Sequence, residues 1–172
     1  MNSAYNDKKY ICIVGNILNN KKFRKIEEFD HHGISRLNHS VRVSYYSYKL
    51  SRLLGLDYRK TARAGLLHDF FLLNNETGKE KLKSVFTHSK EAVKNADSCF
   101  ILSDLECDII KTHMFPLASP QPPKYAEGWI VSLVDKAISL GEFTASYSNN
   151  FSLKFKNATI ITALFLCQVI FK

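Results

Sequence analysis

Apolar residues recur along this chain at intervals of three and four positions, the spacing of one face of an α-helix. The clearest stretch runs from about Leu37 to Leu54, and Gly55 marks its end. Asp57 has a side chain suited to cap a second helix that continues to about Phe70. Another strong helix is expected from about Glu127 to Phe143.

Weaker apolar patterns also favour helices. One or two helices are expected between Tyr10 and Phe29, with Gly33 as a helix stop. A helix is expected from about Thr87 to Ala96, and a capping box of Ser103 and Glu106 predicts the start of another. Since no segment alternates convincingly over several strands, we predict an all-α fold, a helical bundle.

The length of 172 residues suits one domain of ordinary size. We expect an N-terminal helical extension over residues 1–22, a main domain over 23–147 and an apolar tail over 148–172 that packs as a helix. The apolar run from Ala158 to Phe171 is shorter than the roughly 17–25 residues of a membrane-spanning helix. A docking segment or weak contact with a membrane edge stays open for the tail.

Composition narrows the possible partners. Hydrophobic residues make up 45% and charged residues 23%, which argues against disorder. The net charge of +8 suggests an anionic partner, although solubility alone explains it equally well. No basic arm or aromatic pattern gives a strong nucleic-acid signature. The four cysteines form no C-x-x-C motif and no signal peptide is recognisable, so we expect reduced, mostly buried thiols in a cytoplasmic protein.

Four histidines and two aspartates stand at intervals of about one cluster member per predicted helix. Each histidine lies at or near the end of a predicted helix, one aspartate follows a histidine directly, and the other lies on the inner stripe of the last strong helix. The six residues are His39, His68, Asp69, His88, His113 and Asp135. Helices with short connections can bring such ends together, and buried carboxylates need a countercharge. Each histidine alone is more often a core residue, but the joint pattern indicates a site for a divalent transition metal: Fe, Mn, Zn, Co or Ni.

From roughly Phe23 to Phe143 the chain resembles the HD-domain metal-dependent phosphohydrolases. The resemblance rests on LNHSVRVSYY around His39, ARAGLLHDFF with His68 and Asp69, and SLVDKAI around Asp135. His88 in FTHSKEA and His113 in IIKTHMF resemble the binuclear subgroup, which includes HD-type diadenosine tetraphosphate hydrolases.

The resemblance implies a set of metal ligands. His39, His68, Asp69 and Asp135 would hold the first ion, and Asp69 would bridge to a second ion completed by His88 and His113. His68 and Asp69 would form the catalytic pair, and a water or hydroxide between the ions would be the nucleophile. The implied activity is hydrolysis of a phosphomonoester, phosphodiester or phosphoanhydride, with a nucleotide as the expected substrate. A regulatory module that binds metal or nucleotide with little turnover is the alternative, and a scaffold that docks through the apolar tail is a third hypothesis.

Two departures from the family bear on the substrate. Phe70 and Phe71 follow the HD pair where HD-GYP proteins often have Gly-Lys, and Leu72-Leu73-Asn74 lacks the acidic pair of the (p)ppGpp hydrolases. Both of these activities are therefore disfavoured. Candidates to bind substrate phosphate are Arg42, Lys136 and His32, although exposed charge or a polar loop explains each of them as well.

Overall fold

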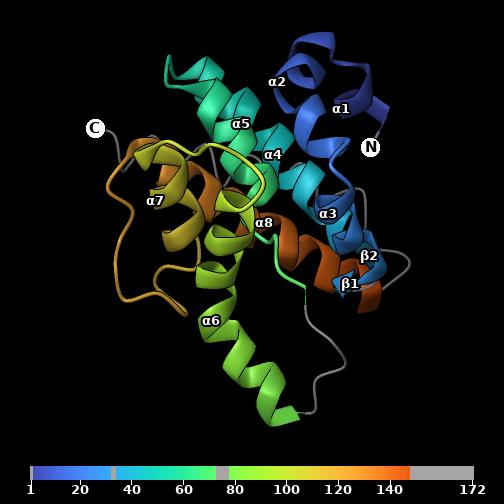
Figure 1. Ribbon diagram of the computed structural model, residues 1–172, viewed down its shortest axis with the longest axis vertical. Coiled ribbons are helices and arrows are strands. Elements are labelled where there is room, and N and C mark those ends of the chain that lie inside the picture. The colour runs from blue at the N-terminus through green and yellow to red at the C-terminus, as the bar shows by residue number, and fades with distance from the viewer. Residues whose placement is uncertain (1, 32–33, 73–77, 148–172) are drawn as a thin grey trace.

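The computed structural model describes residues 2–31, 34–72 and 78–147, and it consists almost entirely of helices (Figure 1). The all-α prediction is confirmed. The elements in chain order are α1 (Asn2–Asn6), α2 (Lys8–Leu18), α3 (Lys21–Arg24), the short 3-10 helix η1 (Lys25–Glu28), β1 (Asp30–His31), β2 (Ile34–Ser35), α4 (Arg36–Leu53), α5 (Tyr58–Leu67), α6 (Gly78–Asp97), α7 (Asp104–Thr112) and α8 (Ala126–Tyr147).

Local capping contacts set the predicted helix ends. Gly55 adopts a positive φ of 71° just after α4, a conformation that glycine reaches without a Cβ clash. The Asp57 side chain accepts a hydrogen bond from Lys60 N at 3.1 Å and so caps α5. Ser103 and Glu106 form the expected capping box at the start of α7. These ends were predictable because each depends on residues only a few positions apart.

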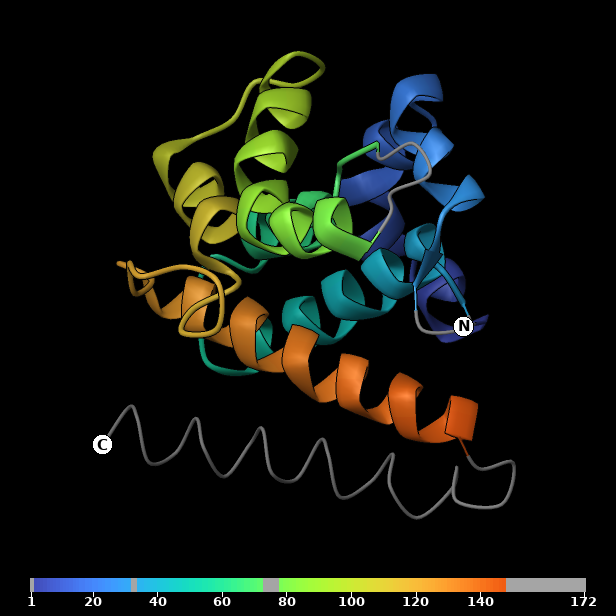
Figure 2. The same cartoon turned by 90° about the horizontal axis from the view of Figure 1, so that it is seen from below.

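One hydrophobic core joins the helices. α4 packs closely on α5, and α8 runs alongside α4 and also contacts α7 (Figure 2). α6 packs against α7, so these five helices surround a common interior. The helix α2 belongs to the same core: Tyr10 is fully buried, and its hydroxyl donates to Ser44 Oγ at 2.8 Å. The predicted boundary after residue 22 stays a prediction, but the chain before it shares the core of the main domain.

Two local predictions were wrong. Gly33 was expected to stop a helix, but η1 already ends at Glu28, and β1 and β2 pair antiparallel on either side of residues 32–33. α6 begins at Gly78, well before the expected start at Thr87. The helical spacing of Leu82, Val85 and Phe86 was a signal for this earlier start, but Gly78 to Lys81 before them carry no large apolar side chain.

The thiols also differ from expectation. Cys12 is exposed, and Cys99 and Cys107 are half-buried, with Cys99 packed against the edge of the core. All three are free thiols, as predicted. Cys167 and the apolar tail over 148–172 lie outside the described residues. Among the helices described, none is both long enough and apolar enough to cross a bilayer.

Candidate metal centre

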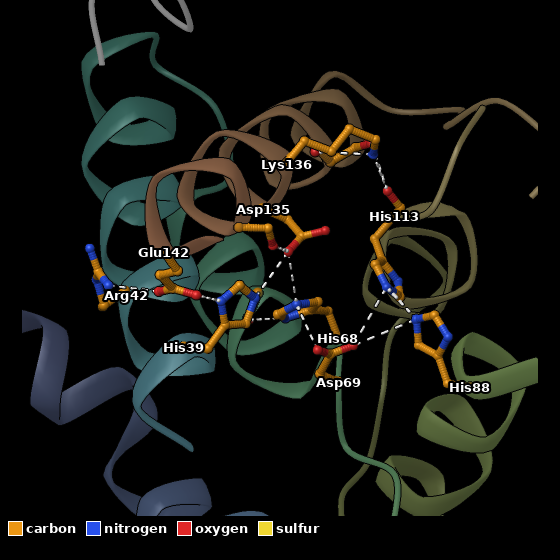
Figure 3. A network of polar contacts seen from close by, with 12 residues as sticks. His39, Arg42, His68, Asp69, His88, His113, Asp135, Lys136 and Glu142 are labelled. Atoms are coloured by element: carbon orange, nitrogen blue, oxygen red, sulfur yellow. Dashed lines mark hydrogen bonds and ion pairs between the residues drawn. The ribbon is translucent and has the colours of Figure 1, made fainter. Parts of the chain in front are cut away.

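The six predicted ligands converge on one buried centre enclosed by α4 to α8 (Figure 3). His39 lies in the first turn of α4, His68 and His113 follow the last residues of α5 and α7, and Asp69 comes directly after His68. Every member of the set is at most 7% exposed.

Of the four histidines expected at or near helix ends, His88 does not lie at one, whereas Asp135 was expected within the last strong helix, on its inner stripe. His88 lies inside α6 because that helix starts at Gly78, and Asp135 lies near the middle of α8. Both still reach the centre, since α6 and α8 pass beside it along their lengths rather than ending there (Figure 3).

The ligand atoms form three overlapping groups, and within each group all atoms lie within 4.8 Å of one another. The groups are His39, His68 and Asp69; His68, His113 and Asp135; and Asp69, His88 and His113. Imidazole nitrogens and carboxylate oxygens together are a donor set for transition metals. Every predicted ligand therefore belongs to at least one group compact enough to hold a cation.

The Asp69 carboxylate divides the centre into two halves. Its Oδ2 atom lies 3.7 Å from His68 Nε2, whereas its Oδ1 atom lies 3.6 Å from His88 Nε2 and 3.7 Å from His113 Nε2. Two ligands on one tetrahedral transition-metal ion are about 3.3–3.6 Å apart, given bonds of about 2.0–2.2 Å. The two oxygens of one carboxylate thus face two different sets of nitrogens at nearly that spacing.

Backbone carbonyls set which nitrogen of two histidines faces inward. His68 Nδ1 donates to Gly65 O at 2.8 Å, and His113 Nδ1 donates to Ile110 O at 2.7 Å. Each ring therefore directs Nε2 toward the centre, and in the neutral form of the ring this nitrogen carries no proton. His68 Nε2 is buried and has no hydrogen-bond partner among the described residues. A buried acceptor without a donor is costly, and a cation at this position would satisfy it.

The charges around the centre keep three of the predicted ligands, Asp69, Asp135 and His113, in a metal-binding form. They have the opposite effect on His68: burial lowers its pKa, but Asp69 and Asp135 outweigh burial and raise it. Burial raises the pKa of Asp69, but His68, His88 and His113 outweigh it and hold that pKa below its ordinary value. The pKa of Asp135 shifts in the same direction, because the hydrogen bond from His39 and the His68 ring 3.6 Å away outweigh burial. Burial, with help from the neighbouring His68 and His88, lowers the pKa of His113 to about 3. At neutral pH both carboxylates are ionised and His113 is neutral.

His39 differs from the other histidines because both of its ring nitrogens face carboxylates. Nε2 lies 3.0 Å from Asp135 Oδ1, and Nδ1 lies 2.8 Å from Glu142 Oε2. Burial opposes protonation, but these two hydrogen bonds outweigh it and raise the pKa of His39 to about 10. A metal ion bound at Nε2 would replace the proton that bridges His39 to Asp135.

Glu142 is a site residue that the sequence analysis missed. Its side chain is 3% exposed, and its Oε1 atom accepts a hydrogen bond from Arg42 Nη1 at 2.7 Å. Glu142 stands seven residues after Asp135, two helical turns along the same face of α8. That spacing was the available signal. Arg42, predicted to bind phosphate, is paired with Glu142 in the structure, and its phosphate role stays a prediction.

The other two predicted phosphate ligands have different outcomes. The Lys136 ammonium donates to His113 O at 2.8 Å, Ser132 Oγ at 2.7 Å and Ser132 O at 3.2 Å. These three bonds use all three of its N–H groups, so phosphate would have to displace one of them. His32 lies outside the described residues.

A buried arginine supports the α6 side of the centre, and the sequence analysis missed it as well. Arg36 donates from Nη1 to Phe71 O at 2.7 Å, and its guanidinium carbon lies 3.8 Å from the centroid of the Phe71 ring. The Phe71 ring in turn packs on the His88 ring, with centroids 5.0 Å apart. Phe71, the second residue after the HD pair, is therefore held between a cation and a predicted ligand.

Comparison with known proteins agrees with this geometry. A family model described as HD domain matches residues 36–139. The match spans 104 of the 172 residues (139 − 36 + 1), from the first residue of α4 to beyond Asp135, and it includes all six predicted ligands. No curated protein matches the chain.

Proposed function

The chain belongs to the HD domain family, within the superfamily of metal-dependent phosphohydrolases, and on this premise we propose that it is a hydrolase with two divalent metal ions in its centre. The proposed reaction is hydrolysis of a phosphomonoester, phosphodiester or phosphoanhydride. The proposed substrate class is a nucleotide, because the net charge of +8 favours the approach of a small anion.

The observation that carries the proposal is the position of Asp69 between two groups of nitrogens. One ion would be held by His39, His68, Asp69 and Asp135. The other would be held by Asp69, His88 and His113. Cations of Fe, Mn, Zn, Co or Ni bound there would lower the pKa of a water molecule and neutralise phosphoryl oxygens.

The protein's own groups prepare this centre before any substrate arrives. The carbonyls of Gly65 and Ile110 orient His68 and His113, so their Nε2 atoms need no rearrangement. The ligands are buried against the core, where charges interact more strongly than in water. Such preorganised charge is the main protein contribution to phosphoryl transfer.

The test begins with metal-free protein reconstituted with Mn²⁺ or Fe²⁺. Metal content is measured by element analysis, and phosphate or nucleotide release is measured over a panel of mononucleotides, cyclic nucleotides and dinucleoside polyphosphates. We expect two ions per chain and turnover of at least one member of the panel. Asp69→Ala should lose both ions and turnover, whereas His88→Ala should lose one ion.

Three results would contradict the proposal. A chain that retains no transition metal has no such centre. Turnover that survives Asp69→Ala cannot depend on the shared carboxylate. Tight nucleotide binding by the metal-loaded protein, without product on any substrate, would instead identify a regulatory module.

A further inference from the structure

Three histidines of the centre donate Nδ1–H to an oxygen behind them and direct Nε2 inward. For His68 and His113 that oxygen is a backbone carbonyl three residues earlier, Gly65 O and Ile110 O. For His39 it is a carboxylate on another helix, Glu142 Oε2, at 2.8 Å. The three rings have the same orientation toward the centre but different means of holding it.

The position of each histidine in its helix explains the difference. His68 and His113 follow the last residues of α5 and α7, and the final carbonyls of a helix have no N–H partner within it. Such carbonyls are free to accept from a nearby ring. His39 lies in the first turn of α4, where the carbonyls accept N–H groups from the next turn. Its ring therefore takes an acceptor from elsewhere in the fold.

We propose that Glu142, held in place by Arg42, is the positioning residue that directs His39 Nε2 toward the metal ion shared with His68, Asp69 and Asp135. This inference rests on the proposed function. A carboxylate that accepts from the outer nitrogen of a ligating histidine fixes its tautomer and makes it a stronger ligand. Neither Glu142 nor Arg42 touches the metal or the substrate in this assignment.

The arrangement around Glu142 fits that role. Arg42 Nη1 binds Oε1 at 2.7 Å and His39 binds Oε2 at 2.8 Å, so each oxygen has its own donor. The Glu142 side chain is only 3% exposed, whereas that of Arg42 is 29% exposed. Arg42 therefore supplies the countercharge from the solvent side and leaves Oε2 directed at the ring (Figure 3).

A second buried pair in the chain provides a matched control. Glu106 is 4% exposed at its side chain and accepts from Arg63 Nε at 2.6 Å and from Ser103, neither of which is a predicted metal ligand. Glu106→Gln thus removes a carboxylate of similar burial and pairing without touching the centre. Its effect measures what loss of a buried Glu–Arg pair, together with the capping box at the start of α7, does to stability.

The experiment compares Mn²⁺ binding by the full chain and its variants, measured by equilibrium dialysis with element analysis. In Glu142→Ala the affinity for one of the two ions should fall about 10–100-fold, with the other ion little changed. Glu142→Gln keeps an acceptor oxygen, so its affinity for that ion should fall less. Glu106→Gln should bind both ions like the wild type, and Arg42→Met should weaken the same ion as Glu142→Ala without raising KM at saturating metal.

A second readout follows the proton itself. In the Zn²⁺-loaded protein, a nitrogen-15 spectrum of the histidine rings should show a protonated Nδ1 on His39, and Glu142→Ala should remove or shift that signal. The Glu106→Gln spectrum should match the wild type. If Glu142→Ala fails to fold, Glu142→Gln supplies both measurements.

The failures are distinguishable. A wild-type chain that binds no transition metal overturns the proposed function and this inference with it. A wild-type chain that binds two ions, together with Glu142 variants of unchanged affinity and an unchanged His39 signal, overturns the inference and leaves the function intact. Arg42→Met that raises KM with unchanged metal affinity would make Arg42 a substrate ligand instead.

Discussion

Gly65→Ala tests how tightly the packing of α5 on α4 sets the position of His68. A Cβ at position 65 would lie 3.1 Å from Ser44 Cα, 3.6 Å from Ser44 N and 3.7 Å from Val131 Cγ2. The nearest atom belongs to the backbone of α4 and cannot rotate away, so one helix must shift. Gly65 O is also the acceptor for His68 Nδ1, and the shift would therefore reach the metal centre.

Two opposing effects set the magnitude. Alanine is more favourable than glycine in a helix interior by about 0.5–1 kcal/mol. Adding a methyl group to a well-packed contact costs about 1–3 kcal/mol. The net expectation is a loss in the free energy of unfolding of about 0–2.5 kcal/mol.

Gly15→Ala is the matched control, because Gly15 lies in α2 and no described atom comes within 4 Å of its added Cβ. Gly15→Ala should therefore be stabilised by the higher helix propensity of alanine, without a steric clash. The two variants should then differ by about 1–3 kcal/mol. For a domain of this size that corresponds to about 2–12 °C in the unfolding midpoint.

The assay is urea and thermal unfolding of the metal-free proteins, followed by circular dichroism, with Mn²⁺ titration of each. Gly65→Ala should unfold at a lower midpoint than Gly15→Ala and should bind Mn²⁺ more weakly, since His68 moves. Equal stabilisation by the two substitutions would refute the close-packing argument. Lower stability with unchanged Mn²⁺ affinity would refute the link from Gly65 to His68.

Three further outcomes are expected. Mn²⁺ at about 100 times its dissociation constant should add about 2.7 kcal/mol to the free energy of unfolding, which is measured as a higher melting midpoint. An equal stabilisation by Ca²⁺, which prefers oxygen ligands, would contradict a nitrogen-rich centre. In metal-free protein the pKa of His113, lowered to about 3, means that stability falls as pH drops from about 6.5, because only the unfolded state takes up the proton. The pKa of His39, raised to about 10, means that stability also falls as pH rises from about 6.5 toward 10. The urea midpoint plotted against pH should therefore have its maximum near pH 6.5. A midpoint that does not change with pH would contradict both pKa shifts. Lys136→Met should lower the free energy of unfolding by about 1–3 kcal/mol, because His113 O loses a charged donor, whereas a raised KM with unchanged stability would favour a phosphate contact.

Partners near in the sequence explain why much of the fold was predictable. Gly55, Asp57 and the Ser103–Glu106 capping box act over at most a few residues, and each forms as expected. The first four residues of α6 were not predictable from periodicity, because Gly78 to Lys81 carry no large apolar side chain, although Leu82, Val85 and Phe86 after them do have helical spacing.

The six candidate ligands were identifiable because each lies in a short, characteristic stretch of sequence, and the HD domain match includes them all. Their partners were not identifiable in the same way. Arg42 pairs with Glu142 across 100 positions, and Lys136 donates to the carbonyl of His113 rather than lying exposed. The partner of each of these charged side chains depends on how α8 packs against α4 and α7.

By itself the sequence determined the helices, most of their ends and the residue types that can bind a metal, since these depend on contacts within one or two turns. Only the tertiary structure decided that Asp69 faces two sets of nitrogens and that Glu142 holds His39. Those arrangements depend on helix packing over long separations, and hydrophobic burial selects the packing without regard to which polar groups it brings together.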